Sequence, residues 1–228
     1  MENETIAEER LDFKKTKVSF IIYMIGQIFM ILGIFSYGSQ YKFFPRWIEN
    51  FAFFSMLAYI LIIIGLVRIR KLHISFSRSL ITMGILITCS FVSHICSTSS
   101  DYTYLTFGKS LEWSCDTLFC ISTIYFFIGC LHIFHELNNE KMAKQVKRLS
   151  ISYFAIFVIF ILFKLGSTMP FILNNILANR IFIYGRLLSE LINYLFVAIC
   201  VVYIAIKVNL MRKEEELKNE EQQETPQD

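Results

Sequence analysis

Six long apolar stretches divide this chain and constrain its fold more than any other feature. A helix that crosses a bilayer needs roughly 20 mostly apolar residues, because the hydrocarbon is about 30 Å thick and each helical residue adds about 1.5 Å. The stretches cover residues 18–37, 51–67, 80–96, 113–135, 149–165 and 181–208. The pattern predicts an all-α, polytopic integral membrane protein whose six transmembrane helices form three antiparallel hairpins.

The composition leads to the same fold class. Of the 228 residues, 55% are hydrophobic and 16% are aromatic, and the mean hydropathy is +0.51. A soluble domain of this length cannot bury so much apolar surface, so a lipid bilayer is the expected partner. We expect an N-terminal arm (1–17), a transmembrane domain (18–208) and a charged tail (209–228), with no room for a separate globular domain.

The positive charges fall mainly on one side of the predicted spans. That side carries Arg10, Lys14, Lys15, Lys17, Arg68, Arg70, Lys71, Arg78, Lys141, Lys144, Lys147, Arg148, Lys207, Arg212, Lys213 and Lys218. The other side carries Lys42, Arg46, Lys109, Lys164, Arg180 and Arg186. Because cytoplasmic loops retain Lys and Arg, both termini are predicted to lie in the cytoplasm, which requires an even number of spans. The basic residues form separate juxtamembrane clusters rather than one stripe, so no nucleic-acid surface is indicated.

Ionisable residues within a span are costly, so they are the first candidates for a functional site. Glu112, Asp116, Cys120 and Thr123 follow a helical spacing and share one face of the fourth span. His94 lies near the outer end of the third span, so His94, Glu112 and Asp116 are predicted to form an outward-facing cluster. Such a cluster would suit Zn²⁺ or a response to external pH. The alternative is that all three lie in water at headgroup depth, and no HExxH motif supports a metal.

A second polar face lies on the sixth span. Arg186 and Glu190 are four residues apart and can pair, which relieves the cost of burying each charge. Asn193 lies deeper, where an amide commonly hydrogen-bonds to another helix. The alternative is a solute-binding site in which Arg186 anchors an anion. We therefore retain Arg186, Glu190 and Asn193 as candidate ligand-binding residues beside the three residues of the outer cluster.

The cysteines and inner histidines allow two further interpretations. Cys96 and Cys115 flank one outer loop and could form a disulfide in an oxidising compartment, whereas the other four cysteines are expected to pack within spans. His132 and His135 lie at the inner end of the fourth span, near His73 in a loop, and could bind a metal or haem. Ordinary interfacial histidines explain this group better, so the cofactor stays unknown.

Three further patterns bear on the architecture. Glu49, Glu112 and Glu190 each open an even-numbered predicted span, which indicates either a repeated hairpin or acids favoured by helix dipoles. No span contains proline, and no span contains a GxxxG pair, so we expect neither broken helices nor close helix crossings. Catalytic signatures such as GxSxG or a phosphate loop are absent from the sequence, so an enzyme is not favoured.

The sixth predicted helix can continue through Lys207 into the tail, because residues 211–223 are good helix formers without Gly or Pro. The last residues are charged and are expected to be disordered. A continuous helix favours a sensory or regulatory membrane module that acts through a cytoplasmic protein partner at its C-terminal helix. The alternative is a small-solute binding or transport component with an outward-facing polar site. The absence of N-x-S/T sites in the predicted outer loops favours a bacterial plasma membrane.

Overall fold

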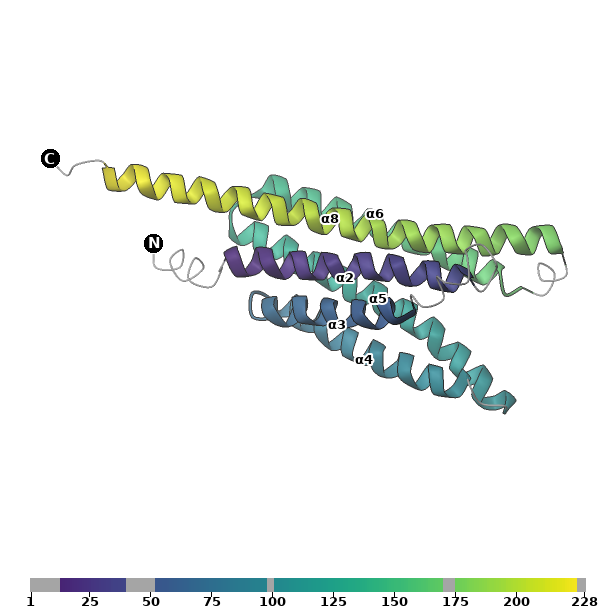
Figure 1. Ribbon diagram of the computed structural model, residues 1–228. Coiled ribbons are helices and arrows are strands. Elements are labelled where there is room, and N and C mark those ends of the chain that lie inside the picture. The colour runs from purple at the N-terminus through teal and green to yellow at the C-terminus, as the bar shows by residue number, and fades with distance from the viewer. Residues whose placement is uncertain (1–12, 40–51, 98–100, 170–174, 225–228) are drawn as a thin grey trace.

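The computed structural model describes residues 13–39, 52–97, 101–169 and 175–224, and within these ranges it contains helices and turns but no strand. The helices are α2 (Phe13–Ser39), α3 (Ala52–Ile69), α4 (Ile74–Ser97), α5 (Tyr102–Glu136), α6 (Glu140–Gly166) and α8 (Ile176–Glu224). Successive helices alternate in direction along one elongated bundle (Figure 1). The predicted all-α fold is confirmed.

Five helices are long and apolar enough to cross a membrane. Their apolar segments are Lys15–Ile34, Ile74–Cys96, Tyr102–Glu136, Glu140–Gly166 and Ile176–Met211. The described part of the second predicted span is the shorter segment Phe53–Ile69, which is near the lower limit of roughly 17 residues for a crossing. The protein is therefore a multi-pass membrane protein, and α3 as a sixth crossing stays a prediction that the alternating helix directions support.

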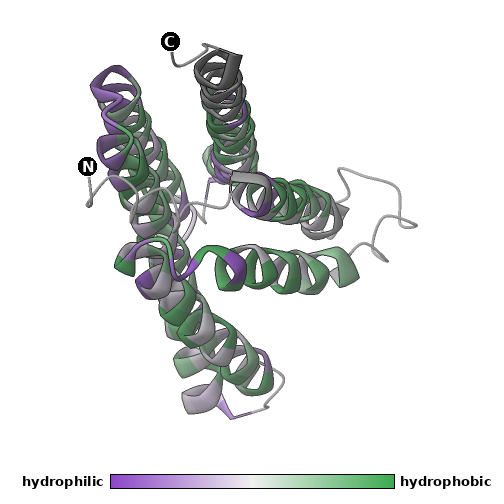
Figure 2. Cartoon of the chain, turned by 90° about the vertical axis from the view of Figure 1, so that its left-hand side faces the viewer, coloured by the Kyte–Doolittle hydropathy of each residue, from purple (hydrophilic) through white to green (hydrophobic). Residues whose placement is uncertain are grey.

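Exposed apolar side chains occur on every described helix. The helices are mainly hydrophobic along their length, and hydrophilic residues gather toward helix ends (Figure 2). A soluble protein rarely exposes apolar patches of this extent, but a bilayer accepts them. The exposed apolar residues include Ile21, Ile25 and Ile28 on α2, Ile81 and Ile85 on α4, and Ile192, Leu195 and Ile199 on α8. These faces suit contact with lipid.

The helices form a closed ring in chain order. Each helix packs against the one before it, and α8 closes the ring by packing against α2. Aromatic rings fill the centre: Phe126 of α5 lies 4.3 Å from Tyr23 and 5.6 Å from Phe20, both on α2, and 5.8 Å from Phe76 on α4, measured between ring centroids. This packing holds the three helices around one core and positions the polar residues described below.

The crossing of α2 and α3 is closer than the sequence predicts. A Cβ atom on Gly26 would lie 3.0 Å from the carbonyl oxygen of Ala58, and one on Gly65 would lie 3.0 Å from the carbonyl oxygen of Ser19. The expectation of no close crossing was wrong, because one glycine on each of two facing helices lets the backbones approach without a GxxxG pair on either.

Helices α5 and α6 begin earlier than predicted. The Asp101 carboxylate caps α5 by accepting a 2.8 Å hydrogen bond from the Thr103 amide, and the Asn139 side chain caps α6 by accepting one of 3.0 Å from the Met142 amide. Glu112 therefore lies ten residues into α5, and Glu190 lies fourteen residues into α8. Helix dipoles act within the first turn, so they do not explain these two carboxylates, and Glu49 lies outside the described residues.

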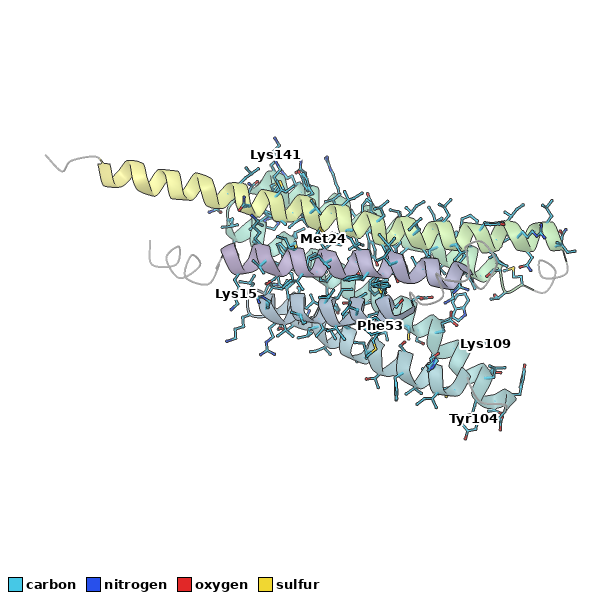
Figure 3. All side chains as sticks on the ribbon, viewed as in Figure 1. Lys15, Met24, Phe53, Tyr104, Lys109 and Lys141 are labelled. Atoms are coloured by element: carbon cyan, nitrogen blue, oxygen red, sulfur yellow. The ribbon has the colours of Figure 1, made fainter. Side chains whose placement is uncertain are left out.

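The basic residues gather at one end of the bundle, which we call the inner end. Figure 3 shows Lys15 and Lys141 at this end and Tyr104 and Lys109 at the opposite, outer end. Helix α8 continues past the inner end as one uninterrupted helix to Glu224 (Figure 1), as the helix-forming residues 211–223 predicted, and residues 225–228 lie outside the described part of the chain. By the positive-inside rule, we predict that the inner end faces the cytoplasm. Pro45, Pro170 and most of the N-terminal arm lie outside the described residues.

Candidate functional site

Charged side chains from three helices meet near the outer end. Lys164 of α6 pairs with Asp116 of α5, and its Nζ lies 3.6 Å from Oε1 of Glu112, also on α5. The same Glu112 oxygen lies 3.2 Å from Nη2 of Arg186 on α8. Glu190 on α8 interacts electrostatically with Asp116 and Arg186. We call these five residues the outer ion-pair cluster, and it joins α5, α6 and α8.

Lys164 is the most deeply buried member of the cluster, with 2% of its side chain exposed. Its ammonium group also lies 4.7 Å from the ring centroid of Trp113, on whose face a cation is favoured. A lysine this close to the end of a membrane helix usually extends toward water. Here the carboxylates of α5 hold it inside the bundle, so α6 is tied to α5 at this level.

The side chains of the cluster differ in their exposure to solvent. Arg186 is 17% exposed, Asp116 is 25% exposed and Glu112 is 52% exposed. Glu112 therefore reaches the outer surface, while the ammonium group that it helps to neutralise is shielded. Three carboxylates face two cations, so the cluster carries an excess negative charge when all its members are ionised. An approaching solute or proton would meet Glu112 first.

A second polar group lies further into the bundle, and we call it the buried polar set. Gln27 of α2, Tyr153 of α6 and Asn193 of α8 are each at most 4% exposed. Within the part of the chain that the structure describes, the Gln27 amide nitrogen and oxygen, the Tyr153 hydroxyl and the Asn193 Oδ1 have no hydrogen-bond partner. Tyr23 and Thr123 lie beside them. Unpaired buried polar atoms cost about 1–3 kcal/mol each, a cost that small side-chain rotations within this set, a water molecule or a solute would relieve.

The structure brings together four of the six predicted site residues, namely Glu112, Asp116, Arg186 and Glu190. Asn193 lies deeper, in the buried polar set. His94 is exposed on α4, and no group of three His, Cys, Asp or Glu side chains suitable for a metal occurs among the described residues. Asp116 pairs with Lys164, so the structure gives no support to a metal site formed by His94, Glu112 and Asp116.

Lys164 was missed as a site residue because the charge count treated it as one of the outer loop charges. Its position inside an apolar run was a usable signal, since a lysine there needs a partner. Gln27, in the middle of the first span, carried the same signal. Neither residue shares a helix with another charged or amide side chain at pairing distance, so helical spacing alone could not join them to the site.

The cysteine and histidine alternatives are not supported by the structure. Cys96 and Cys115 are both free thiols, and the Cys115 thiol donates a weak hydrogen bond of 3.8 Å to the Leu86 carbonyl oxygen. The His73 and His132 rings are stacked with centroids 4.0 Å apart, which leaves no space for a haem between them. Burial lowers the pKa of His73 below its usual value, and the neighbouring His132 lowers it further, whereas Glu136 opposes these effects.

No protein-family model, curated protein or solved structure matches this chain. The fold and the cluster define the class as an all-helical, multi-pass membrane protein with charged residues joined across its outer half. Any function has to be argued from the chain's own residues.

Proposed function

We propose that this chain is a sensory or regulatory membrane module in which the outer ion-pair cluster is the input and α8 is the output. The observation that carries the proposal is the position of Arg186, which pairs with Glu112 at the outer end while its own helix continues without a break to Glu224. A change at the cluster therefore acts directly on a helix that leaves the bundle at the inner end.

The pairing in the cluster suits a switch between two arrangements. Lys164 and Arg186 hold carboxylates of α5 against α6 and α8, so losing one pair leaves a buried charge that needs a new partner. A buried pair contributes little net stability, but removing one partner costs roughly 3–5 kcal/mol. The bundle responds to such a cost by repacking helices, commonly through shifts of about 1–2 Å.

The proposed output acts through a second protein that contacts the projecting part of α8. Helix α8 contacts both α2 and α6 inside the bundle and then projects beyond them (Figure 1). The projecting sequence, from Arg212 to Glu224, has nine charged residues among its thirteen. A small shift of α8 at the outer end would reorient this charged segment toward or away from a cytoplasmic partner.

Photocrosslinking from the tail tests this proposal. A benzophenone amino acid replaces Leu217 in the full chain, and adducts are compared in cell membranes between the natural sequence, Lys164→Met and Lys109→Met. We expect a discrete adduct whose yield changes at least about threefold with Lys164→Met and stays constant with Lys109→Met, since Lys109 lies outside the cluster. Equal adduct yields in all three proteins, or no adduct in any, would refute the regulatory role.

The buried polar set supports a second candidate function, a component that binds or conducts a small uncharged solute. The two Gln27 amide atoms, the Tyr153 hydroxyl and the Asn193 Oδ1 lie inward of the ion-pair cluster without a hydrogen-bond partner among the described residues. Urea and glycerol carry the donors and acceptors that these atoms need. Osmotic swelling of proteoliposomes with either solute should exceed that of empty liposomes and fall with Asn193→Leu. Swelling equal to that of empty liposomes would exclude conduction of these solutes.

A further inference from the structure

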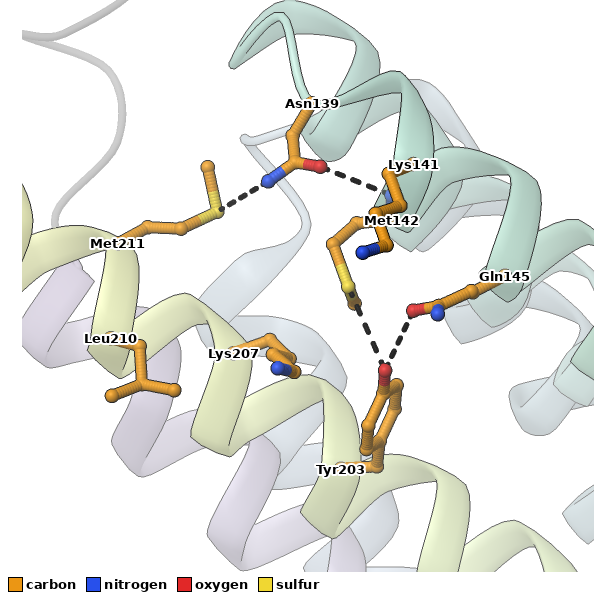
Figure 4. Close-up of a pocket in the computed structure, with 8 residues that line it drawn as sticks. All are labelled: Asn139, Lys141, Met142, Gln145, Tyr203, Lys207, Leu210 and Met211. Atoms are coloured by element: carbon orange, nitrogen blue, oxygen red, sulfur yellow. Dashed lines mark hydrogen bonds between the residues drawn. The ribbon is translucent and has the colours of Figure 1, made fainter.

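A cavity of about 250 Å³ lies at the inner end between the start of α6 and α8. Figure 4 shows the side chains of its two walls facing each other across the space, with Lys141 and Gln145 on α6 and Tyr203 and Lys207 on α8. It is far along α8 from Arg186, so it is separate from the outer ion-pair cluster. Its position coincides with the inner ends of two predicted spans.

Two lysines give the cavity a positive charge. Lys141 is exposed and Lys207 is half-buried, with its ammonium group 5.7 Å from the ring centroid of Tyr203. Among the described side chains, neither lysine forms an ion pair with a carboxylate. The nearby Lys144, by contrast, lies 3.5 Å from Glu140. Among the described side chains the cavity therefore holds two cations without a matching anion, which suits a ligand with a negative charge.

The cavity also holds oriented amide donors. The Asn139 Oδ1 accepts from the Met142 amide, so its Nδ2 must point the other way, where its partner is the Met211 sulfur at 3.8 Å. A thioether is a weak acceptor that an oxygen would readily replace. The Gln145 Oε1 accepts a 2.6 Å hydrogen bond from the Tyr203 hydroxyl, which leaves its amide nitrogen to donate. Figure 4 shows these contacts.

Apolar side chains complete the lining and connect it with the membrane face. Met142, Met211 and Leu210 border the cavity, and Leu210 is 43% exposed. Met211 contacts Asn139 and Met142 contacts Tyr203, so the apolar lining residues lie directly beside the polar ones. Leu210 is one helical turn from Ile206, another exposed apolar residue of α8. Basic pockets between membrane helices on the cytoplasmic side are suited to phosphate-bearing lipid headgroups.

We propose that this cavity binds the phosphate of an anionic phospholipid, with Lys141 and Lys207 as its cations and the amide groups of Asn139 and Gln145 as its donors. The acyl chains lie along the exposed apolar side of α8. A free phosphate ion would satisfy the same cations, but it would leave the methionine and leucine side of the cavity unused. The proposal does not depend on the regulatory function.

Native mass spectrometry of the full chain, released from detergent micelles, tests this site. Phosphatidylglycerol and phosphatidylcholine with the same acyl chains are added in equal amounts to the natural protein, to Lys141→Met/Lys207→Met and to the control Lys144→Met/Lys147→Met. We expect the natural protein and the control to retain phosphatidylglycerol preferentially, and the cavity variant to lose that preference by about tenfold. Gln145→Met, which keeps the side-chain size but removes a donor, should reduce it partially.

Each other outcome overturns the proposal. Equal retention of the two lipids by the natural protein would show that the cavity does not select an anionic lipid. An equal loss of preference in both double variants would show that net charge, rather than the cavity, causes the preference. Displacement of phosphatidylglycerol by millimolar inorganic phosphate, with retention of the phosphate, assigns the site to the free ion instead. Circular dichroism of every variant confirms that helix content is kept, so a loss of binding is not a loss of fold.

Discussion

Lys164 and Asp116 form an ion pair inside the helix bundle, although they lie 48 residues apart and on different helices. Because Lys164 is almost completely buried, its charge is tolerated only while the carboxylates of α5 remain beside it. The pair therefore makes the outer position of α6 depend on α5. Glu112 of α5 also pairs with Arg186, so the outer position of α8 depends on α5 as well.

Removing the acid of this pair should destabilise the protein, and removing both partners should restore it. We expect Asp116→Leu to cost about 2 kcal/mol, less than the roughly 3–5 kcal/mol for a fully isolated charge, because Glu112 still lies 3.6 Å from Lys164. Asp116→Leu/Lys164→Met should recover most of that loss. Unfolding by SDS in mixed micelles measures both. The control Glu140→Gln breaks an exposed ion pair and should change the stability little. A double variant that is less stable than Asp116→Leu would contradict the pairing.

The close crossing of α2 and α3 predicts that Gly26→Ala is destabilising. The added Cβ would lie 2.7 Å from Cγ1 of Ile62 and 3.0 Å from the Ala58 carbonyl oxygen, so the two helices must separate, at a cost of about 1–3 kcal/mol. Gly84→Ala is the matched control, because no heavy atom lies within 4 Å of its added Cβ. The same unfolding assay compares them, and equal stability of the two variants would show that the crossing is looser.

The stacked histidines at the inner end predict a pH dependence of stability. Burial lowers the pKa of His73 from its usual value of 6.5, so the unfolded chain takes up a proton first as the pH falls. Stability from this group is present above pH 6.5 and is lost as the pH falls from there through the folded pKa. We expect His73→Phe to reduce the difference in stability between pH 7.5 and pH 5.5, whereas His94→Gln, on an exposed face, should preserve it. An unchanged difference in His73→Phe would assign the effect to another group.

The predicted orientation can be tested with single cysteines in a cysteine-free background. Ser110→Cys, in the exposed outer part of α5, should react with an impermeant maleimide added outside intact cells. Lys144→Cys, near the start of α6, should react only after the membrane is opened. The physical reason is the retention of Lys and Arg on the cytoplasmic side. The reverse labelling pattern would mean that the basic end faces outward.

The sequence predicted which site residues share a face of one helix better than it predicted which residues meet between helices. Helical spacing placed Glu112 and Asp116 on one face of α5, and the structure keeps them together around Lys164. His94 was grouped with them from its depth in the third span, which does not show which side of the helix it lies on; it is exposed, whereas Phe76 of the same helix packs against Phe126 in the core. The apolar stretches marked each described helix but not its start, because Asp101 and Asn139 cap α5 and α6 within polar sequence that a hydropathy criterion does not assign to a span.

The distance between the inner end of α2 and the projecting part of α8 tests the central claim most directly. Spin labels at Lys15→Cys and Lys218→Cys, in a background without the six natural cysteines, are measured by pulsed electron resonance in lipid nanodiscs. If the outer ion-pair cluster controls α8, Lys164→Met changes the mean distance between the two labels by about 2 Å or more, while Lys109→Met leaves it unchanged. Identical distance distributions in all three proteins would show that the cluster does not control α8.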